Sequence, residues 1–137
     1  PAWKTVLGRG LSRLVPALAL PTDIDPAIVS HDPAVVEAYG TDPLVGHVAS
    51  ARWLTETTRA QADVKAAAAR IKLPVLLQQA GDDRLASPEA AKAVFDTLGS
   101  ADKTFTPYPG LFHEIWFEQD RGPVLDALGA WLDAHLP

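Results

Sequence analysis

The second half of the chain alternates short apolar runs with helical patterns. Residues 74–79 form a short apolar run introduced by proline, which is typical of a buried parallel strand, and residues 103–108 predict a second strand. A helix is expected over residues 87–98, where a capping serine, a proline and an acid open it, and a last helix over residues 122–135. This order of strand, helix, strand and helix predicts an α/β fold with two parallel strands joined by a right-handed crossover.

Proline divides the first third of the chain, where we expect no strand. Because proline blocks helix interiors and strand ladders, this third should consist of short helices joined by bends. Asp32-Pro33 and Asp42-Pro43 each pair a capping side chain with proline at the first helical position. Residues 50–71 then predict one longer helix, capped by Ser50. The prolines concerned are Pro1, Pro16, Pro21, Pro26, Pro33 and Pro43.

Composition restricts the classes of function. With 137 residues, 47% of them hydrophobic and 21% charged, the chain suits one globular domain or a large piece of one. The net charge of −5 and the scattered lysines and arginines argue against nucleic-acid binding, which needs concentrated positive charge. The absence of cysteine excludes disulfides, a thiolate nucleophile and cysteine-based metal sites, and fits a cytoplasmic protein. We identify no apolar run of membrane-spanning length and no signal peptide.

Titratable residues follow both predicted strands. Asp82 and Asp83 come after the first strand, and His113, 30 residues beyond Asp83, comes after the second. Because ligands bind beyond the carboxyl ends of parallel strands, we expect these side chains within hydrogen-bond reach of one another. A carboxylate that orients an imidazole is two-thirds of a Ser-His-Asp triad. The pattern alone also allows solvated turn aspartates and a surface histidine.

Six short motifs follow one another along most of the chain. They are Ser30-His31-Asp32-Pro33, residues 39–45, residues 73–85, Asp102-Lys103-Thr104, residues 108–114 and Trp131-Leu132. In this order they resemble the cap, the catalytic-acid segment, the catalytic-histidine segment and the closing helix of monoacylglycerol lipases and lysophospholipases. These enzymes are α/β-hydrolases of the serine aminopeptidase S33-like family. The resemblance implies that the chain is the C-terminal part of such a hydrolase.

The resemblance also implies a role for each titratable residue. Asp83, which directly precedes Arg84-Leu85, matches the acid of the catalytic triad, whereas Asp82 matches a variable position. His113 matches the base of the triad. Ala80 departs from the glycine usual in the family, but the acid stays in register.

The implied organisation is a helical cap over residues 1–70 and the C-terminal part of the hydrolase core over residues 71–137. The implied substrate is a lipid ester such as a monoacylglycerol or a lysophospholipid, and neither a metal nor an organic cofactor is implied. In this family the cap forms an apolar entrance and can touch membranes. Residues 11–20, which include Arg13 and have Lys4 and Arg9 nearby, are therefore a candidate for peripheral membrane contact, or alternatively pack on the cap core.

The nucleophile of the triad is missing from this chain. In the family it lies in a Gly-x-Ser-x-Gly elbow that precedes the acid, but Ser12, Ser30 and Ser50 lack flanking glycines and do not lie between a strand and a helix. We therefore expect an N-terminal portion of the same hydrolase, in the same polypeptide or as a separate chain, to supply the serine and the oxyanion hole. Two strands are too few to cover the helices, so we also expect this chain to be ordered only with that portion.

Two alternatives stay open. A carboxylesterase or a peptidase would use the same fold, because fold alone does not determine the substrate. The missing serine would equally suit a non-catalytic binding fragment.

His31, His47 and His135 show no metal-ligand spacing and are expected to be structural or exposed, with His135 favourably placed near a helix C-terminus. Trp116 and Phe117 are expected to pack in the core, with lining of the substrate pocket as the alternative.

Overall fold

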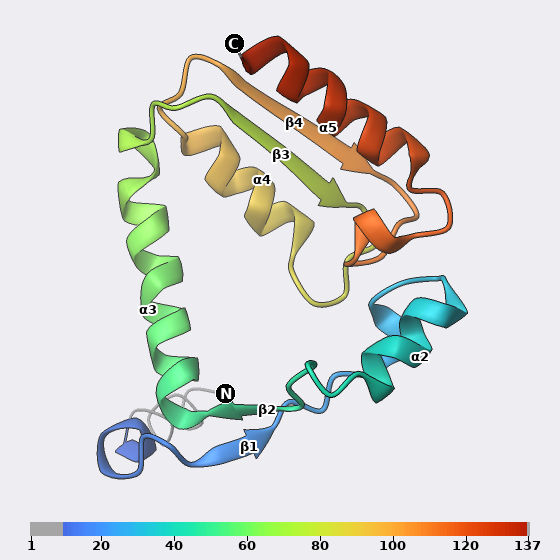
Figure 1. Ribbon diagram of the computed structural model, residues 1–137. Coiled ribbons are helices and arrows are strands. Elements are labelled where there is room, and N and C mark those ends of the chain that lie inside the picture. The colour runs from blue at the N-terminus through green and yellow to red at the C-terminus, as the bar shows by residue number, and fades with distance from the viewer. Residues whose placement is uncertain (1–9, 137) are drawn as a thin grey trace. The chain divides into compact units, whose positions relative to one another are not determined.

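The computed structural model describes residues 10–136, which form two compact units. One unit contains residues up to Ile24 together with Pro43–Ala66, and the other contains Asp25–Asp42 together with residues from Ala67 onward. We call them unit 1 and unit 2 (Figure 1). Residues 25–42 therefore pack with the second half of the chain. The division into a cap over residues 1–70 and a core over residues 71–137 stays a prediction.

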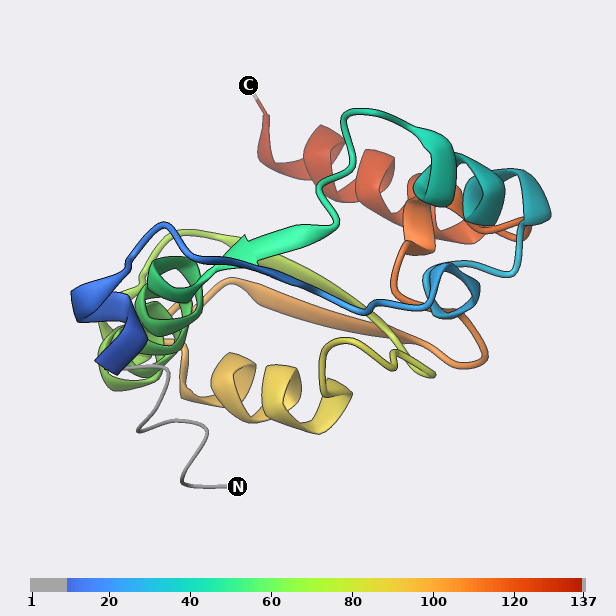
Figure 2. The same cartoon turned by 90° about the horizontal axis from the view of Figure 1, so that it is seen from below.

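A parallel pair of strands forms the centre of unit 2. Strand β3 (Val75–Ala80) pairs with β4 (Lys103–Tyr108), and the register runs from Val75 opposite Lys103 to Ala80 opposite Tyr108. The crossover helix α4 (Pro88–Thr97) and the final helix α5 (Gly122–His135) lie on opposite faces of the pair (Figure 2). The predicted order of strand, helix, strand and helix is thus confirmed.

Local chemistry determines where α4 begins and ends. The Ser87 side chain accepts a hydrogen bond from the Ala90 amide, and Pro88 occupies the first helical position, as the sequence predicts. At the other end, the Lys103 ammonium donates to the carbonyls of Phe95, Asp96 and Leu98. This positive charge complements the negative end of the helix dipole and joins the end of α4 to the start of β4.

The core of unit 2 combines an apolar cluster with a polar bridge. Ala80, Ile115 and Val124 are buried, and Tyr108 packs against them. Gln78 of β3 donates from its amide nitrogen both to the Tyr108 hydroxyl and to the Val124 carbonyl, each at 2.8 Å. Because these partners belong to β4 and α5, one side chain joins three elements through satisfied hydrogen bonds.

The segment of unit 2 that comes from the first third of the chain contains two short helices. These are η1 (Pro26–Ile28) and α2 (Pro33–Thr41), and the side chains of Asp25 and Asp32 cap them. The helix expected to begin at Asp42-Pro43 is absent among the described residues. Asp42 instead donates its backbone N–H to Ala38 and thereby ends α2.

Unit 1 contains strands, contrary to our expectation for the first third of the chain. β1 (Ala19–Pro21) pairs antiparallel with β2 (Val48–Ser50), and the register places Ala19 opposite Ser50. Such three-residue strands are too short for an alternating pattern, and each depends on a partner far away in sequence. The long helix occurs as α3 (Ala51–Ala67) followed by the 3-10 turn η2 (Ala68–Arg70), with Ser50 capping it through the Trp53 amide.

His135 generates a prediction about stability and pH. Its Nδ1 bonds to the Trp131 carbonyl at 2.6 Å, and its Nε2 bonds to the Asp102 carboxylate at 2.9 Å. The hydrogen bond to the Trp131 carbonyl raises the pKa of His135 most, burial lowers it by less, and the hydrogen bond and charge of Asp102 raise it further, so the pKa lies above its ordinary value. A raised folded-state pKa stabilises the fold below the unfolded pKa, and this contribution disappears as pH rises through the folded pKa.

We therefore expect His135→Gln to lower stability more at about pH 5.5 than at about pH 8.5, values on either side of the ordinary imidazole pKa of about 6.5. Urea denaturation midpoints of the wild type and the variant, both expressed from the complete reading frame, measure this difference at the two pH values. An equal loss at both pH values would contradict the linkage.

Candidate active site

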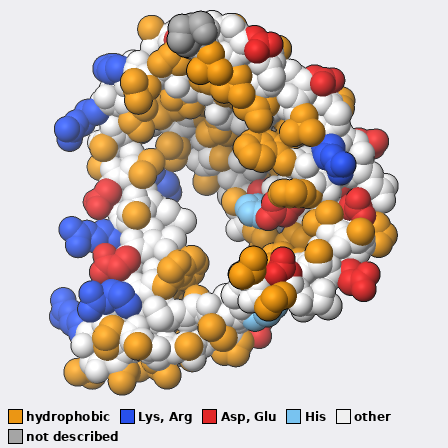
Figure 3. All heavy atoms as spheres, in the orientation of Figure 1, with side chains coloured by type: hydrophobic (Ala, Val, Ile, Leu, Met, Phe, Trp, Pro, Cys, Tyr) orange, Lys and Arg blue, Asp and Glu red, His pale blue; other side chains and the backbone are white. Residues whose placement is uncertain are grey.

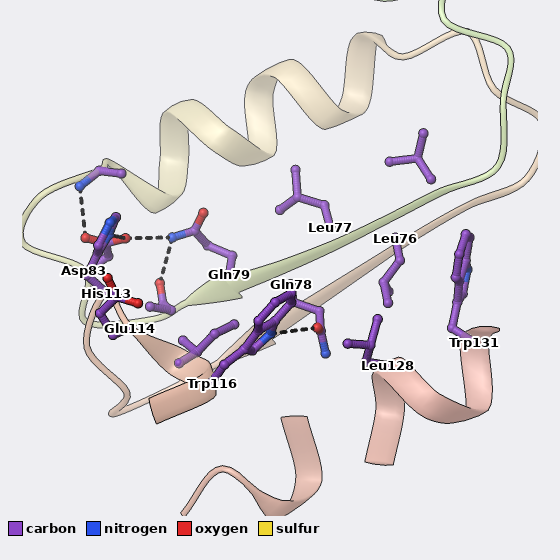
Figure 4. Close-up of a pocket in the computed structure, with 14 residues that line it drawn as sticks. Leu76, Leu77, Gln78, Gln79, Asp83, His113, Glu114, Trp116, Leu128 and Trp131 are labelled. Carbon is purple, nitrogen blue, oxygen red and sulfur yellow. Dashed lines mark hydrogen bonds and ion pairs between the residues drawn. The ribbon is translucent and has the colours of Figure 1, made fainter. Parts of the chain in front are cut away.

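The parallel register brings the predicted acid and base together. Asp83 follows β3, His113 follows β4, and His113 Nδ1 lies 2.9 Å from Asp83 Oδ2 (Figure 4). The expected hydrogen-bond reach is confirmed. Asp82 is exposed, and its backbone N–H donates to the Leu111 carbonyl. The geometry thus selects Asp83 over Asp82 as the partner of the imidazole, as the motif predicts.

Hydrogen bonds hold the Asp83 carboxylate in one orientation. Oδ1 accepts from the backbone amides of Leu85 at 2.8 Å and Ala86 at 2.9 Å. Oδ2 accepts from His113 and, at 3.4 Å, from the Gln79 side chain. The Asp83 side chain is 4% exposed. A carboxylate with this many partners keeps its direction while the imidazole beside it changes protonation state.

The electrostatics keep Asp83 ionised. Burial alone would raise the pKa of Asp83, but hydrogen bonds from Ala86, His113 and Leu85 outweigh it and lower the pKa below the ordinary value. An ionised Asp83 accepts a hydrogen bond from His113 Nδ1, which keeps the proton on that nitrogen. The neutral imidazole then carries its lone pair on Nε2, which is the tautomer that a general base requires.

The outer nitrogen of His113 is available for chemistry. The His113 side chain is 39% exposed. Within residues 10–136, no hydrogen-bond partner contacts Nε2, whereas Nδ1 is engaged by Asp83. An imidazole held through one nitrogen and open at the other can accept a proton from a hydroxyl placed beside it.

Gly81 allows the two loops of the site to approach each other. Its N–H donates to the Tyr108 carbonyl at 2.8 Å, so the ladder continues one residue past the strands. A Cβ at this position would lie 2.7 Å from the Pro109 Cα and 2.9 Å from the Tyr108 carbonyl oxygen. Only glycine therefore fits where the loop of the acid contacts the loop of the base. Sequence reasoning did not single out Gly81, although a glycine directly after a strand is a signal for close backbone approach.

None of the serines in the described part of the chain is bonded to His113. Ser12 bonds to Thr55, and Ser30 is buried beside Glu118. Contrary to our expectation, Ser50 does lie between a strand and a helix, because it ends β2 directly before α3. It has alanines instead of glycines on both sides, and its hydroxyl caps α3. Beyond the predicted acid, Ser87 caps α4 and bonds to Glu89, while the Ser100 hydroxyl donates to the Asp102 carbonyl. The contacts of all five serines of the sequence are thus structural, which agrees with a nucleophile from elsewhere.

Two aromatic residues near His113 differ from expectation. Trp116 and Phe117 were expected to pack in the core, but they are 48% and 54% exposed. The Trp116 indole N–H donates to the Gln78 side-chain oxygen at 3.3 Å, and this bond holds the ring beside β3. Trp116 instead lines the pocket along β3, which was the alternative role for these rings.

A pocket of about 660 Å³ lies along β3 beside the acid and the base. Its lining includes every residue of β3, and successive strand residues point to opposite faces. A hollow that contacts both faces must follow the unpaired edge of the strand, because β4 occupies the other edge. Accordingly, the first four residues of β3 are only half-buried, whereas we expected a buried strand. The remaining lining residues are Asp83, Ala86, His113, Glu114, Ile115, Trp116, Leu128 and Trp131.

Metal chemistry finds no support in this part of the chain. Among residues 10–136, no three His, Cys, Asp or Glu side chains come together as a metal site would require. His31 and His135 bond to carboxylates, and the backbone carbonyl of His47 accepts from Thr22.

Comparison with known proteins identifies the family. The family described as "Serine aminopeptidase, S33" matches residues 1–120. The chain belongs to this family. As an S33 member it is 32% identical to a monoacylglycerol lipase of Mycolicibacterium smegmatis over 130 residues, which cover 92% of this chain and 45% of the lipase. Phospholipase YtpA of Bacillus subtilis is 29% identical over 129 residues, which cover 93% of this chain and 50% of the phospholipase.

Solved structures show the fold. The crystal structure of Paleococcus ferrophilus monoacylglycerol lipase matches with a TM-score of 0.83 and 31% identity, over 98% of this chain and 53% of that chain. A monoglyceride lipase from Saccharomyces cerevisiae matches with a TM-score of 0.84 at 24% identity, over 96% of this chain and 47% of that chain. The predicted fold class, part of an α/β-hydrolase, is confirmed. This S33 chain spans about half the length of the relatives it matches.

The close approach at Gly81 can be tested with a pair of matched substitutions. Gly81→Ala should lower the free energy of unfolding by about 1–3 kcal/mol, because the added methyl group meets backbone atoms that cannot move independently. Gly129→Ala is the control, because nothing lies within 4 Å of its Cβ and alanine favours the helix. Urea denaturation measures both, and equal stability of the two variants would contradict the steric argument.

Proposed function

We propose that this chain supplies the acid and the base of a serine ester hydrolase of the monoacylglycerol lipase type. The observation that carries the proposal is the 2.9 Å hydrogen bond between Asp83 and His113, at the ends of parallel strands in an S33 chain. His113 is the general base and Asp83 is the residue that orients it. The nucleophilic serine and the oxyanion donors come from an N-terminal portion of the same hydrolase.

In this mechanism His113 first accepts a proton as general base and then donates the same proton as general acid. Nε2 takes the proton of the serine hydroxyl as the serine oxygen bonds to the ester carbonyl carbon, and the same proton passes to the leaving alcohol as the ester C–O bond breaks. Water then repeats the sequence on the acyl-enzyme, releasing the fatty acid and restoring the serine. Throughout, the ionised Asp83 stabilises the imidazolium and keeps Nε2 directed at the reacting atoms.

The unpaired edge of β3 supports the proposal that a further segment of the hydrolase completes the sheet. The pocket is lined by every residue of β3, so it extends along the whole strand. An open edge of a parallel strand exposes unpaired N–H and C=O groups. The relatives are about twice as long as this chain. We therefore propose that the N-terminal portion adds a strand at this edge and places its serine beside His113. A sample of this chain alone that is monomeric and unfolds cooperatively would contradict this partnership.

A lipid ester is the substrate class that the names of the relatives favour, since they include a monoacylglycerol lipase and a phospholipase. The competing substrates are short carboxylic esters and aminoacyl compounds on the same fold. Relative turnover of a long-chain monoacylglycerol, a p-nitrophenyl ester and an aminoacyl amide separates them. The lipid-ester proposal requires the highest kcat/KM for the monoacylglycerol.

The roles of the two residues predict large losses of activity. In the protein expressed from its complete reading frame, Asp83→Asn and His113→Gln should each lower kcat roughly 10³- to 10⁴-fold, because each removes the oriented base. Asp82→Asn is the matched control, because it removes the neighbouring exposed charge and should leave kcat within about twofold. Hydrolysis of a p-nitrophenyl ester measures all three. Full activity of Asp83→Asn would refute its role.

The alternative, a non-catalytic binding fragment, differs in its reaction with a fluorophosphonate probe. The probe labels a serine only where a base activates it. Labelling of the full-length protein or of a co-purifying chain, abolished by His113→Gln, supports the enzyme. Absence of labelling in every chain supports the binding fragment.

We also propose that unit 1 contacts membranes peripherally, in a protein that is otherwise cytoplasmic. No described helix is long and apolar enough to cross a bilayer. Large apolar side chains are nevertheless exposed over β1, β2 and the start of α3 (Figure 3). Leu14 and Leu18 belong to the expected interfacial segment 11–20, whereas its basic neighbours Lys4 and Arg9 lie outside the described residues.

Membrane contact predicts that the double substitution Leu14→Glu and Leu18→Glu weakens binding to phosphatidylcholine vesicles by more than about tenfold, because each leucine loses its apolar burial. Leu136→Glu, an exposed leucine of unit 2, is the control and should bind like the wild type. Co-sedimentation measures the binding. Equal binding of the double variant and the wild type would refute the contact.

A further inference from the structure

A buried carboxylate lies next to the loop of the candidate base. Glu118 follows η3 (Ile115–Phe117) and is 1% exposed. Burying a carboxylate is costly unless hydrogen bonds replace its water shell. Four do so here. Oε1 accepts from the Phe112 amide at 2.8 Å and from His31 Nδ1 at 2.9 Å, while Oε2 accepts from the His31 amide at 3.0 Å and from the Ser30 hydroxyl at 3.3 Å.

These hydrogen bonds reach the backbone on both sides of His113. The residue before it, Phe112, donates its N–H directly to Glu118. The residue after it, Glu114, donates its N–H to the Val29 carbonyl at 2.8 Å. Val29 directly precedes the two residues that Glu118 binds. The Glu118 carboxylate therefore binds the backbone before His113 directly. It holds the backbone after His113 indirectly, through residues 29–31, which lie more than 80 positions away in sequence.

Ring contacts reinforce the same arrangement. The His31 imidazole stacks on the Phe112 ring with centroids 3.7 Å apart and an interplanar angle of 26°. The guanidinium carbon of Arg84, the residue after Asp83, lies 4.6 Å from the centroid of the Phe112 ring. Phe112 thus contacts both the loop of the acid and the segment that Glu118 holds.

Glu118 is ionised in this position. Burial alone would raise its pKa, but hydrogen bonds from Phe112 and His31 outweigh this effect and lower the pKa. All of its partners are donors. A glutamine at position 118 would turn an NH₂ group toward two of them in either orientation, so it could not reproduce the arrangement.

We propose that Glu118 is a positioning residue for His113, which fixes the backbone of His113 through Phe112 and through residues Val29–His31. The catalytic consequence rests on the function proposed above, whereas the geometric consequence does not. Asp83 holds the imidazole by its side chain, and Glu118 holds the peptide that carries it. Loss of Glu118 should therefore misplace Nε2 of His113 while leaving Asp83 and the pocket-lining residues of β3 in place.

The test compares Glu118→Gln with Asp120→Asn in the protein expressed from its complete reading frame. Both remove one negative charge from the same loop, but Asp120 is exposed and makes none of the four bonds. We expect Glu118→Gln to lower kcat for a p-nitrophenyl ester by about tenfold to hundredfold, with KM changed less than about threefold, because a small displacement of a catalytic group acts on the transition state. Asp120→Asn should leave both parameters near wild type.

A spectroscopic measurement separates positioning from stability. The Nδ1 proton shared by His113 and Asp83 gives a downfield NMR resonance in histidine-¹⁵N-labelled protein, and it is assigned by its loss in His113→Gln. We expect Glu118→Gln to shift or broaden this resonance and Asp120→Asn to leave it unchanged. If Glu118→Gln does not fold, His31→Phe replaces it, because phenylalanine keeps the stacking on Phe112 and removes one hydrogen bond.

The outcomes distinguish the two proposals. A shifted His113 resonance together with a loss in kcat supports the inference. A shifted resonance in a protein whose wild type hydrolyses no ester supports the positioning of His113 but refutes the proposed function. An unmoved resonance in a folded variant overturns the inference, and so does a loss confined to KM.

Discussion

The parallel pairing of β3 with β4 is the constraint on which the rest of unit 2 depends. Because the register ends with Ala80 opposite Tyr108, the loops that follow the two strands begin side by side. Gly81 has no side chain, so these loops approach until its N–H meets the Tyr108 carbonyl. Asp83 and His113, far apart in sequence, then lie 2.9 Å apart. The candidate chemistry therefore follows from backbone geometry before any side chain is considered.

Two buried carboxylates hold the same histidine in different ways. Asp83 accepts a hydrogen bond from the imidazole Nδ1–H, and its other oxygen accepts hydrogen bonds from backbone amides. Glu118 accepts hydrogen bonds from the backbone amides of Phe112 and His31. The carbonyl of Val29, in the same segment as His31, accepts a hydrogen bond from the Glu114 amide. In both cases hydrogen bonds more than offset desolvation, as the lowered pKa values indicate. Side chain and backbone of His113 are thereby constrained independently.

The unpaired edge of β3 agrees with the greater length of the relatives. One edge of β3 is satisfied by β4, whereas the other borders the pocket, and the strand is only half-buried along most of its length. The S33 relatives extend over about twice this length. The acid and the base line that same pocket, beside the edge of β3 with which no described strand pairs.

Local pattern was sufficient for the elements of the second half of the chain, whereas the choice of Asp83 and His113 also needed the family resemblance. Apolar runs, Ser87-Pro88 and the family motifs predicted β3, α4, β4, α5, Asp83 and His113, because these signals depend on neighbours within one turn or one strand. The strands β1 and β2, the exposure of Trp116 and Phe117, and the contacts of Glu118 were decided by tertiary structure. Glu118 resembles any loop acid in the sequence. Only the approach of residues 29–31, more than 80 positions away, makes it a buried carboxylate. A contact between residues so far apart leaves no signal in the sequence around Glu118.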